Sequence, residues 1–174
     1  MSKGKLRFEE DVIGPAVETF LKKNFYKVLK ELIIRVKDFP PPSRSIRLDF
    51  LALDKSQSLI FECKKYSTPY YIGVGLGEVL MQRALLRREK SKIDEREHIQ
   101  IQEPIRLGLC FCDFTQSYNE FPRGYRWTTW NQSCTDLLNN LIRDIGESIV
   151  VLLVKAKVVK PSYRELLPSD LYVE

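Results

Sequence analysis

The stretch IRLDFLALDKSQSLIFECKKY, residues 46–66, decides how the rest of the chain is interpreted. Two apolar segments, SIRLDFLALD and SLIFECKKY, flank a short polar turn at 55–57, and this pattern predicts a β-hairpin. Asp49, Glu62 and Lys64 interrupt strands that are otherwise rich in Leu, Ile and Phe. Charged groups in strand interiors are costly unless something pairs with them. The hairpin therefore predicts a cluster in which the two acids and the lysine have partners.

The register of the hairpin determines whether the two acids meet. Residues two apart in a strand face the same side, so Glu62 and Lys64 point together. If Leu53 pairs with Ser58, the same register places Asp49 directly opposite Glu62, with Cβ atoms about 4.5–5.5 Å apart. A register slip of two residues would keep the acids as diagonal neighbours, whereas a slip of one would separate them.

Two opposed carboxylates and a lysine are the parts needed for phosphodiester hydrolysis. Carboxylates at that separation raise each other's pKa unless a cation lies between them. Mg²⁺ (or Mn²⁺) suits such oxygen ligands, which makes Asp49 and Glu62 the candidate metal ligands. Lys64 could orient the attacking water, help to deprotonate it, or neutralise charge that builds on a phosphate. A surface salt-bridge cluster is the alternative, because Glu-x-Lys alone is a weak motif.

The periodicity of the remaining chain predicts an α/β fold with a mixed β-sheet flanked by helices, in a single domain of residues 1–174. The expected order is α-β-β-β-α-β-α-β. Outside the hairpin, the expected helices are 8–30, 70–90 and 131–147, and the expected strands are 31–39, 105–114 and 148–159. Pro15 is either the first residue of the first helix or a kink within a longer one.

Composition sets broader bounds. The chain is 44% hydrophobic, and no apolar window approaches the length of about 18 residues that could span a bilayer. MSKGKLRFEEDVIG lacks the apolar run of a secretory signal, so we expect an intracellular (cytoplasmic) protein without membrane attachment. Four cysteines predict reduced, buried thiols rather than a disulfide scaffold. The net charge of +5 permits a polyanionic partner, although a solvated surface explains the spread of basic residues almost as well.

The segments RLDFLAL and LIFECKKY, with Asp49, Glu62 and Lys64, resemble the PD-(D/E)xK nuclease superfamily, which includes restriction endonucleases and archaeal Holliday junction resolvases. The resemblance implies a restriction endonuclease-like αβββαβ core at about 8–114, with 115–174 as a C-terminal elaboration. It implies a metal-dependent endonuclease or exonuclease that binds nucleic acid, with DNA favoured. By the same resemblance, the backbone carbonyl of Cys63 would be a further metal ligand.

Further candidate site residues lie on the two helices of that core. Members of the family often carry another acid on the first helix, and Glu10 is the best match, with Glu9 and Glu18 as rivals and an ordinary helix-start acid as the alternative. Many members also place a glutamine early in the next helix. Here Glu78 occupies that position and Gln82 follows one turn later, so both are expected to support the site. Leu48 stands where the motif's name has proline, and neither departure removes a proposed ligand.

Basic residues are candidates for contacts with nucleic-acid phosphates, although a solvated surface explains them nearly as well. The segment NEFPRGYRWTTWNQ, residues 119–132, adds Tyr125 or Trp127 for stacking on an unpaired base, or an aromatic latch over the core. The candidates are Lys65, Arg83, Arg87, Arg88, Arg123 and Arg126.

Two other classes of function remain open. The chain could be a non-catalytic nucleic-acid-binding module that retains the nuclease fold. It could also be a structural protein that associates through the strand at 148–159, which is expected to be either a central strand or an edge at which a homodimer forms.

Overall fold

The computed structural model describes residues 9–40, 45–114, 130–158 and 171–173, and it has the predicted mixed α/β architecture. A π-helical turn, η1, precedes three α-helices and six strands in the described chain. Their bounds are η1 Glu9–Ile13, α1 Gly14–Asn24, β1 Lys27–Arg35, β2 Ser45–Leu53, β3 Ser58–Lys64, α2 Pro69–Glu97, β4 Ile105–Phe114, α3 Gln132–Ile145, β5 Ile149–Val158 and β6 Leu171–Val173.

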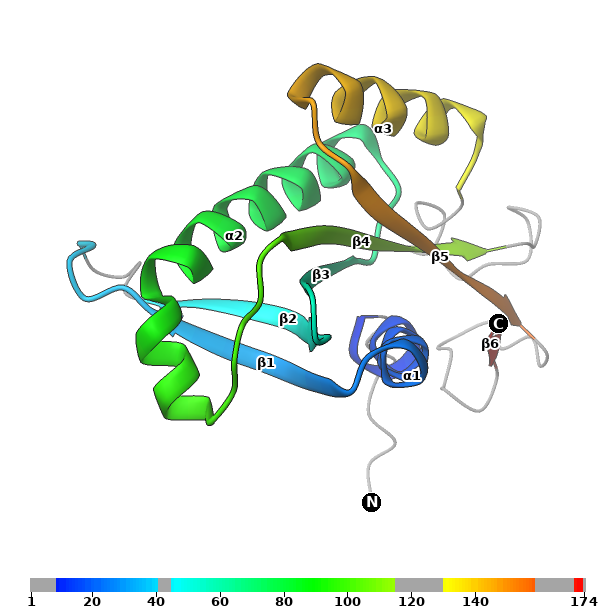
Figure 1. Ribbon diagram of the computed structural model, residues 1–174. Helices are drawn as coiled ribbons and strands as arrows, with labels where there is room; N and C mark the ends of the chain where they lie inside the picture. The colour runs from blue at the N-terminus through cyan, green and yellow to red at the C-terminus, as the bar shows by residue number, and fades with distance from the viewer. Residues whose placement is uncertain (1–8, 41–44, 115–129, 159–170, 174) are drawn as a thin grey trace.

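The six strands form one mixed sheet in the order β1-β2-β3-β4-β5-β6 (Figure 1). The pairs β1–β2 and β2–β3 are antiparallel, β3–β4 and β4–β5 are parallel, and β5–β6 is antiparallel. The parallel pairs are joined by α2 and α3, because a parallel connection needs a crossover long enough for a helix. β5 has β4 along one side, and the short β6 lies beside only its last three residues, so the rest of that side is an edge in the described part of the sheet.

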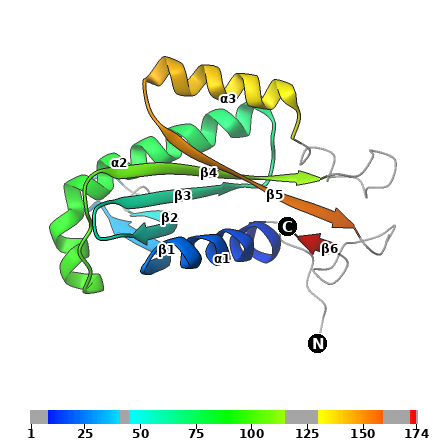
Figure 2. The same cartoon turned by 45° about the vertical axis from the view of Figure 1, so that its right-hand side comes forward.

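Helices cover both faces of the sheet (Figure 2). α1 packs on one face, where Val17 and Leu21 are buried with Phe50 and Phe61. The other face carries α2 and α3, in two further apolar clusters. In the described part of the chain, no helix has both the length and the apolar character needed to cross a membrane.

The first helix is shorter than predicted. α1 ends at Asn24, and β1 begins at Lys27 rather than at residue 31. Val28 has helical spacing from apolar residues of α1, but β1 instead pairs it with Ala52 of β2, and it packs against the α1 cluster from the sheet. Pro15 lies in the first turn of α1, but η1 runs directly into this helix and Ile13 between them has α-helical dihedrals, so Pro15 lies within a longer helical segment at the change from π- to α-helix.

The second helix is longer than predicted, since it continues beyond residue 90 to Glu97. Ile93 anchors this extension, with 1% of its surface exposed, and a Lys90–Asp94 ion pair joins successive turns. His98 ends the helix in the left-handed conformation, with φ 50°. All four cysteines are buried free thiols, as predicted.

Candidate active site

The predicted hairpin register is confirmed. Leu53 pairs with Ser58, and Phe50 pairs with Phe61. The next step of the same register places Asp49 across from Glu62, at the point where the described ladder between β2 and β3 ends.

Glu62 is buried and both of its carboxylate oxygens accept hydrogen bonds. Its residue surface is 6% exposed. Lys64 donates from Nζ to Oε1 at 2.7 Å, and Gln82 of α2 donates from Nε2 to Oε2 at 2.8 Å. β3 therefore supplies the acid and the lysine from one face, and α2 supplies the amide.

Glu78, one helical turn before Gln82, forms an ion pair with Lys64 through Oε2. Gly75, a further turn back, is what lets the lysine lie against the helix, because a Cβ at that position would be 3.1 Å from Cγ of Lys64. We call Glu62, Lys64, Glu78 and Gln82 the acid–lysine cluster. The sequence predicted all four as site residues, and the structure brings them into contact.

Asp49 lies beside this cluster but faces a different partner. Its Oδ2 accepts a hydrogen bond of 2.8 Å from the backbone N–H of Cys63. It also lines a small pocket of about 50 Å³, whose other lining residues are Gly14, Lys30, Glu31, Arg47, Phe50 and Cys63. Glu62 is not among the lining residues of this pocket, but the two acids are near enough for the charge of Asp49 to raise the pKa of Glu62.

The position of Asp49 follows from a change of face in both β1 and β2. Glu31 lies between the pairs Lys30↔Phe50 and Leu32↔Leu48, which places it opposite Asp49. Its φ of 55° lies in the left-handed region, and at this residue the side chains of the strand change from one face of the sheet to the other. Phe50 packs in the cluster of α1, whereas Leu32 and Leu48 pack in the cluster of α2. Asp49 therefore sits where the strand passes from one face to the other.

Sequence reasoning missed Glu31 as a residue of this site. The sequence carries no signal for it, because Val28, Leu32 and Ile34 keep an even spacing across Glu31, although Val28 packs against the cluster of α1 and Leu32 in that of α2. A left-handed non-glycine residue inside a strand is uncommon and tends to occur at functional sites.

The electrostatics of the acid–lysine cluster depend on burial and on Asp49. Desolvation, followed by the negative charge of Asp49, raises the pKa of Glu62 to about 7, although Lys64 and Gln82 act in the opposite direction. Burial by itself lowers the pKa of Lys64, but Glu62 and Glu78 outweigh it and raise that pKa above its usual value. Lys64 is therefore held as an ammonium ion at neutral pH.

Three predicted phosphate-binding arginines already have acidic partners. Arg83 pairs with Glu147, with Nη1 2.9 Å from Oε2. Arg87 forms a bidentate ion pair with Glu103, with N···O distances of 2.9 and 3.0 Å. Arg88 forms a bidentate ion pair with Asp38, with N···O distances of 3.2 and 3.0 Å.

For the remaining predicted site residues, the structure describes a contact, a backbone position, or nothing. Lys65 has its Nζ 4.8 Å from the centre of the Tyr66 ring. The backbone of Glu10 lies in η1, which contacts β3 and β4, but its side chain lies outside the described part of the structure. Arg123 and Arg126 also lie outside the described residues.

Asp49 and Glu62 offer carboxylate oxygens, the ligand type that Mg²⁺ and Mn²⁺ prefer. Within the described ranges, no group of three or more His, Cys, Asp or Glu side chains is placed to hold a metal ion. Mg²⁺ is commonly bound by only one or two carboxylates, with waters and substrate phosphates completing its coordination. Asp49 lines a pocket of about 50 Å³, and Glu62 is not among its lining residues, so this pocket by itself does not join the two acids. The thiol of Cys63 would not contribute, because its hydrogen bond with Cys110 raises its pKa.

Comparison with protein-family models, with curated proteins and with solved structures gave no match for this chain.

The left-handed conformation of Glu31 can be tested by substitution. Replacing Glu31 with glycine is expected to raise the free energy of unfolding by about 1 kcal/mol, because glycine adopts positive φ without the cost that a Cβ imposes. Only a weak contact is lost, since Nη1 of Arg47 lies 3.9 Å from Oε1 of Glu31. Urea denaturation of Glu31→Gly and Glu31→Ala would check this, and equal stabilities for the two variants would argue against a left-handed residue here.

Proposed function

We propose that this chain is a metal-dependent nuclease of the PD-(D/E)xK type that hydrolyses phosphodiester bonds in DNA. The observation that carries the proposal is the buried carboxylate of Glu62, held by Lys64 and Gln82 and raised in pKa partly by the neighbouring Asp49. A buried acid that bears excess negative charge beside a second acid is suited to bind a cation. The order of helix, three strands, helix and strand agrees with the core of that family.

In this proposal each residue has a distinct role. Asp49 and Glu62 would hold the divalent cation, with the carbonyl of Cys63 as a further ligand and Glu10 as a supplementary acid. The bound cation would supply Lewis-acid stabilisation of the charge on the phosphate. Lys64, held as an ammonium ion, would donate a hydrogen bond and positive charge to the phosphate rather than accept a proton. Glu78 and Gln82 would keep Lys64 and Glu62 in position.

A specific observation also favours a second candidate, a non-catalytic nucleic-acid-binding module. Each oxygen of Glu62 already accepts a hydrogen bond from a protein group, which leaves about one lone pair on each oxygen for a cation and gives the acid a structural role without metal. A module of this kind would bind DNA whether or not metal is present.

Purified protein incubated with linear, single-stranded and branched DNA separates the two candidates. With Mg²⁺ or Mn²⁺ we expect shortened or nicked products, which EDTA should prevent. Isothermal titration with Mn²⁺ alone should show binding that strengthens between pH 6 and 8, because the cation competes with the proton on Glu62. Metal-independent DNA binding without products on any substrate would overturn the nuclease proposal in favour of the module. Absence of DNA binding under all conditions would overturn both.

A further inference from the structure

A second charged pocket lies between β1 and the C-terminal half of α2. Its volume is about 670 Å³, within the range of about 300–1,000 Å³ that is usual for ligand pockets. Five basic and two acidic side chains line it, which gives the lining a formal net charge of +3. The lining residues are Arg35, Lys37, Asp38, Arg88, Glu89, Lys92, Ile93 and Arg96.

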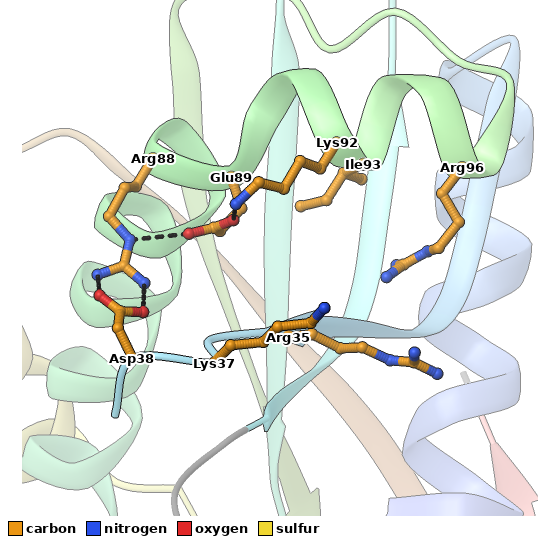
Figure 3. A pocket seen from close by; sticks show the side chains of 8 residues that line it. All are labelled: Arg35, Lys37, Asp38, Arg88, Glu89, Lys92, Ile93 and Arg96. Atoms are coloured by element: carbon orange, nitrogen blue, oxygen red, sulfur yellow. Dashed lines mark hydrogen bonds and ion pairs between the residues drawn. The ribbon is translucent and has the colours of Figure 1, made fainter. Parts of the chain in front are cut away.

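The two acidic residues of this pocket form ion pairs with basic side chains of α2. Asp38 accepts a bidentate pair of hydrogen bonds from Arg88 (Figure 3). Glu89, which is 7% exposed, lies between Nε of Arg88 at 3.0 Å and Nζ of Lys92 at 2.6 Å. These contacts fix the side chain of Arg88, so less conformational entropy would be lost when a ligand binds beside it.

Arg35 and Lys37 provide the excess charge. Arg96 is held by a hydrogen bond of 2.6 Å from Nη2 to the backbone carbonyl of Ile33, and its Nε pairs with Oε1 of Glu97, also at 2.6 Å, so its charge has an acidic partner outside the lining. Arg35 and Lys37 come from the end of β1 and the residues after it, and their exposed side chains face the pocket (Figure 3). No acidic partner of either is found among the described residues. An open pocket with unneutralised positive charge along one wall attracts anions.

The position of the pocket relates it to the candidate active site. Arg35 follows Glu31 by four residues on β1, and Glu31 opposes Asp49. At about 3.3 Å per residue, this places Arg35 roughly 13 Å along the strand from the level of Asp49. Successive phosphates on one strand of a duplex advance by about 3.4 Å along the helix axis, so about four base pairs span that distance.

We propose that this pocket binds backbone phosphates of the nucleic acid whose scissile phosphate lies at Asp49 and Lys64. This inference rests on the proposed function for the position of the cleaved bond, but it concerns binding rather than hydrolysis. The pocket contacts phosphates without reading base sequence, and it determines affinity and orientation of the strand.

The experiment measures binding of a fluorescently labelled DNA duplex by anisotropy, in EDTA and across a range of salt concentrations. The test variant is Arg35→Ala/Lys37→Ala. The matched control, Lys23→Ala/Lys55→Ala, removes the same charge from exposed positions near the end of α1 and in the turn between β2 and β3. Thermal melting of each variant confirms that it is folded.

We expect the test variant to bind at least about tenfold more weakly at low salt, with a slope of log affinity against log salt that is smaller by about 2. The control should lose much less affinity, and Arg35→Lys/Lys37→Arg should restore binding. Wild-type affinity and slope in the test variant would overturn this inference while leaving the proposed nuclease site intact. Weakened binding in a protein that never cleaves DNA would support the pocket and overturn the nuclease. Binding of inorganic phosphate at the pocket, with unchanged DNA binding, would identify a small-anion site and overturn the assignment to nucleic acid.

Discussion

Replacing Asp49 with asparagine is expected to reduce DNA cleavage by about 1000-fold, because the substitution removes one of the two charges proposed to hold the catalytic cation. The fold should tolerate the change. Asparagine keeps a side-chain oxygen that can accept the hydrogen bond from the N–H of Cys63. Single-turnover cleavage with saturating enzyme and Mg²⁺ would measure the chemical step directly.

The chain provides a matched control for this substitution. Asp54 also accepts a backbone hydrogen bond, from Lys55 at 2.7 Å, but it lies just beyond the C-terminal end of β2, five residues after Asp49. Asp54→Asn should cleave at the wild-type rate. Binding of uncut DNA should be retained by Asp49→Asn, since the charge that it removes is negative. Equal cleavage by wild type and Asp49→Asn would exclude Asp49 as a metal ligand.

Local patterns predicted the hairpin and the shared face of Glu62 and Lys64, whereas Glu78 and Gln82 were predicted as site residues from the family resemblance. The short polar turn made Leu53–Ser58 the first register to consider, with slips of one or two residues as alternatives, and the structure has the unslipped register. The period of the helix then placed Glu78 and Gln82 on one side of α2, from which both reach β3. Each of these inferences depends on residues close together in the sequence.

The features that were missed depend on distant contacts or on unusual backbone conformation. A glutamate in the left-handed region cannot be predicted from propensity, so the face change at Glu31 and the resulting direction of Asp49 were not foreseen. Arg83 and Arg88 were predicted to be available for phosphates. Their acidic partners, 64 and 50 residues away in the sequence, are brought to them only by the complete fold.

The second large effect concerns stability rather than catalysis. The pKa of Glu62 is raised to about 7 in the folded protein from an ordinary value of 4.5, so the folded state binds its proton more tightly than the unfolded state does. The contribution of this proton to stability is fully present below pH 4.5 and is lost as the pH rises through about 7. A pKa shift of this size corresponds to about 3 kcal/mol in the free energy of unfolding.

In the wild type, the free energy of unfolding should therefore fall by about 3 kcal/mol between pH 4.5 and 7.5, measured by urea denaturation in EDTA. In Glu62→Gln this fall should be absent. Glutamine stays neutral and can still accept a hydrogen bond from Lys64. The buried Oε1 of Gln82, which has no hydrogen-bond partner in the described structure, could accept from the new amide if the Gln82 amide rotates. Glu103→Gln is the control, because Arg87 lowers the pKa of Glu103, and its contribution to stability is lost as the pH falls.

The same measurement tests the proximity of the two acids without relying on activity. The charge of Asp49 is the second-largest cause of the raised pKa of Glu62, after desolvation. Asp49→Asn should therefore move the upper limit of the pH-dependent decline to a lower pH and make the decline smaller. A decline that is unchanged in Asp49→Asn would mean that the two carboxylates do not interact. The paired-acid basis for cation binding would then be lost, whatever the protein does to DNA.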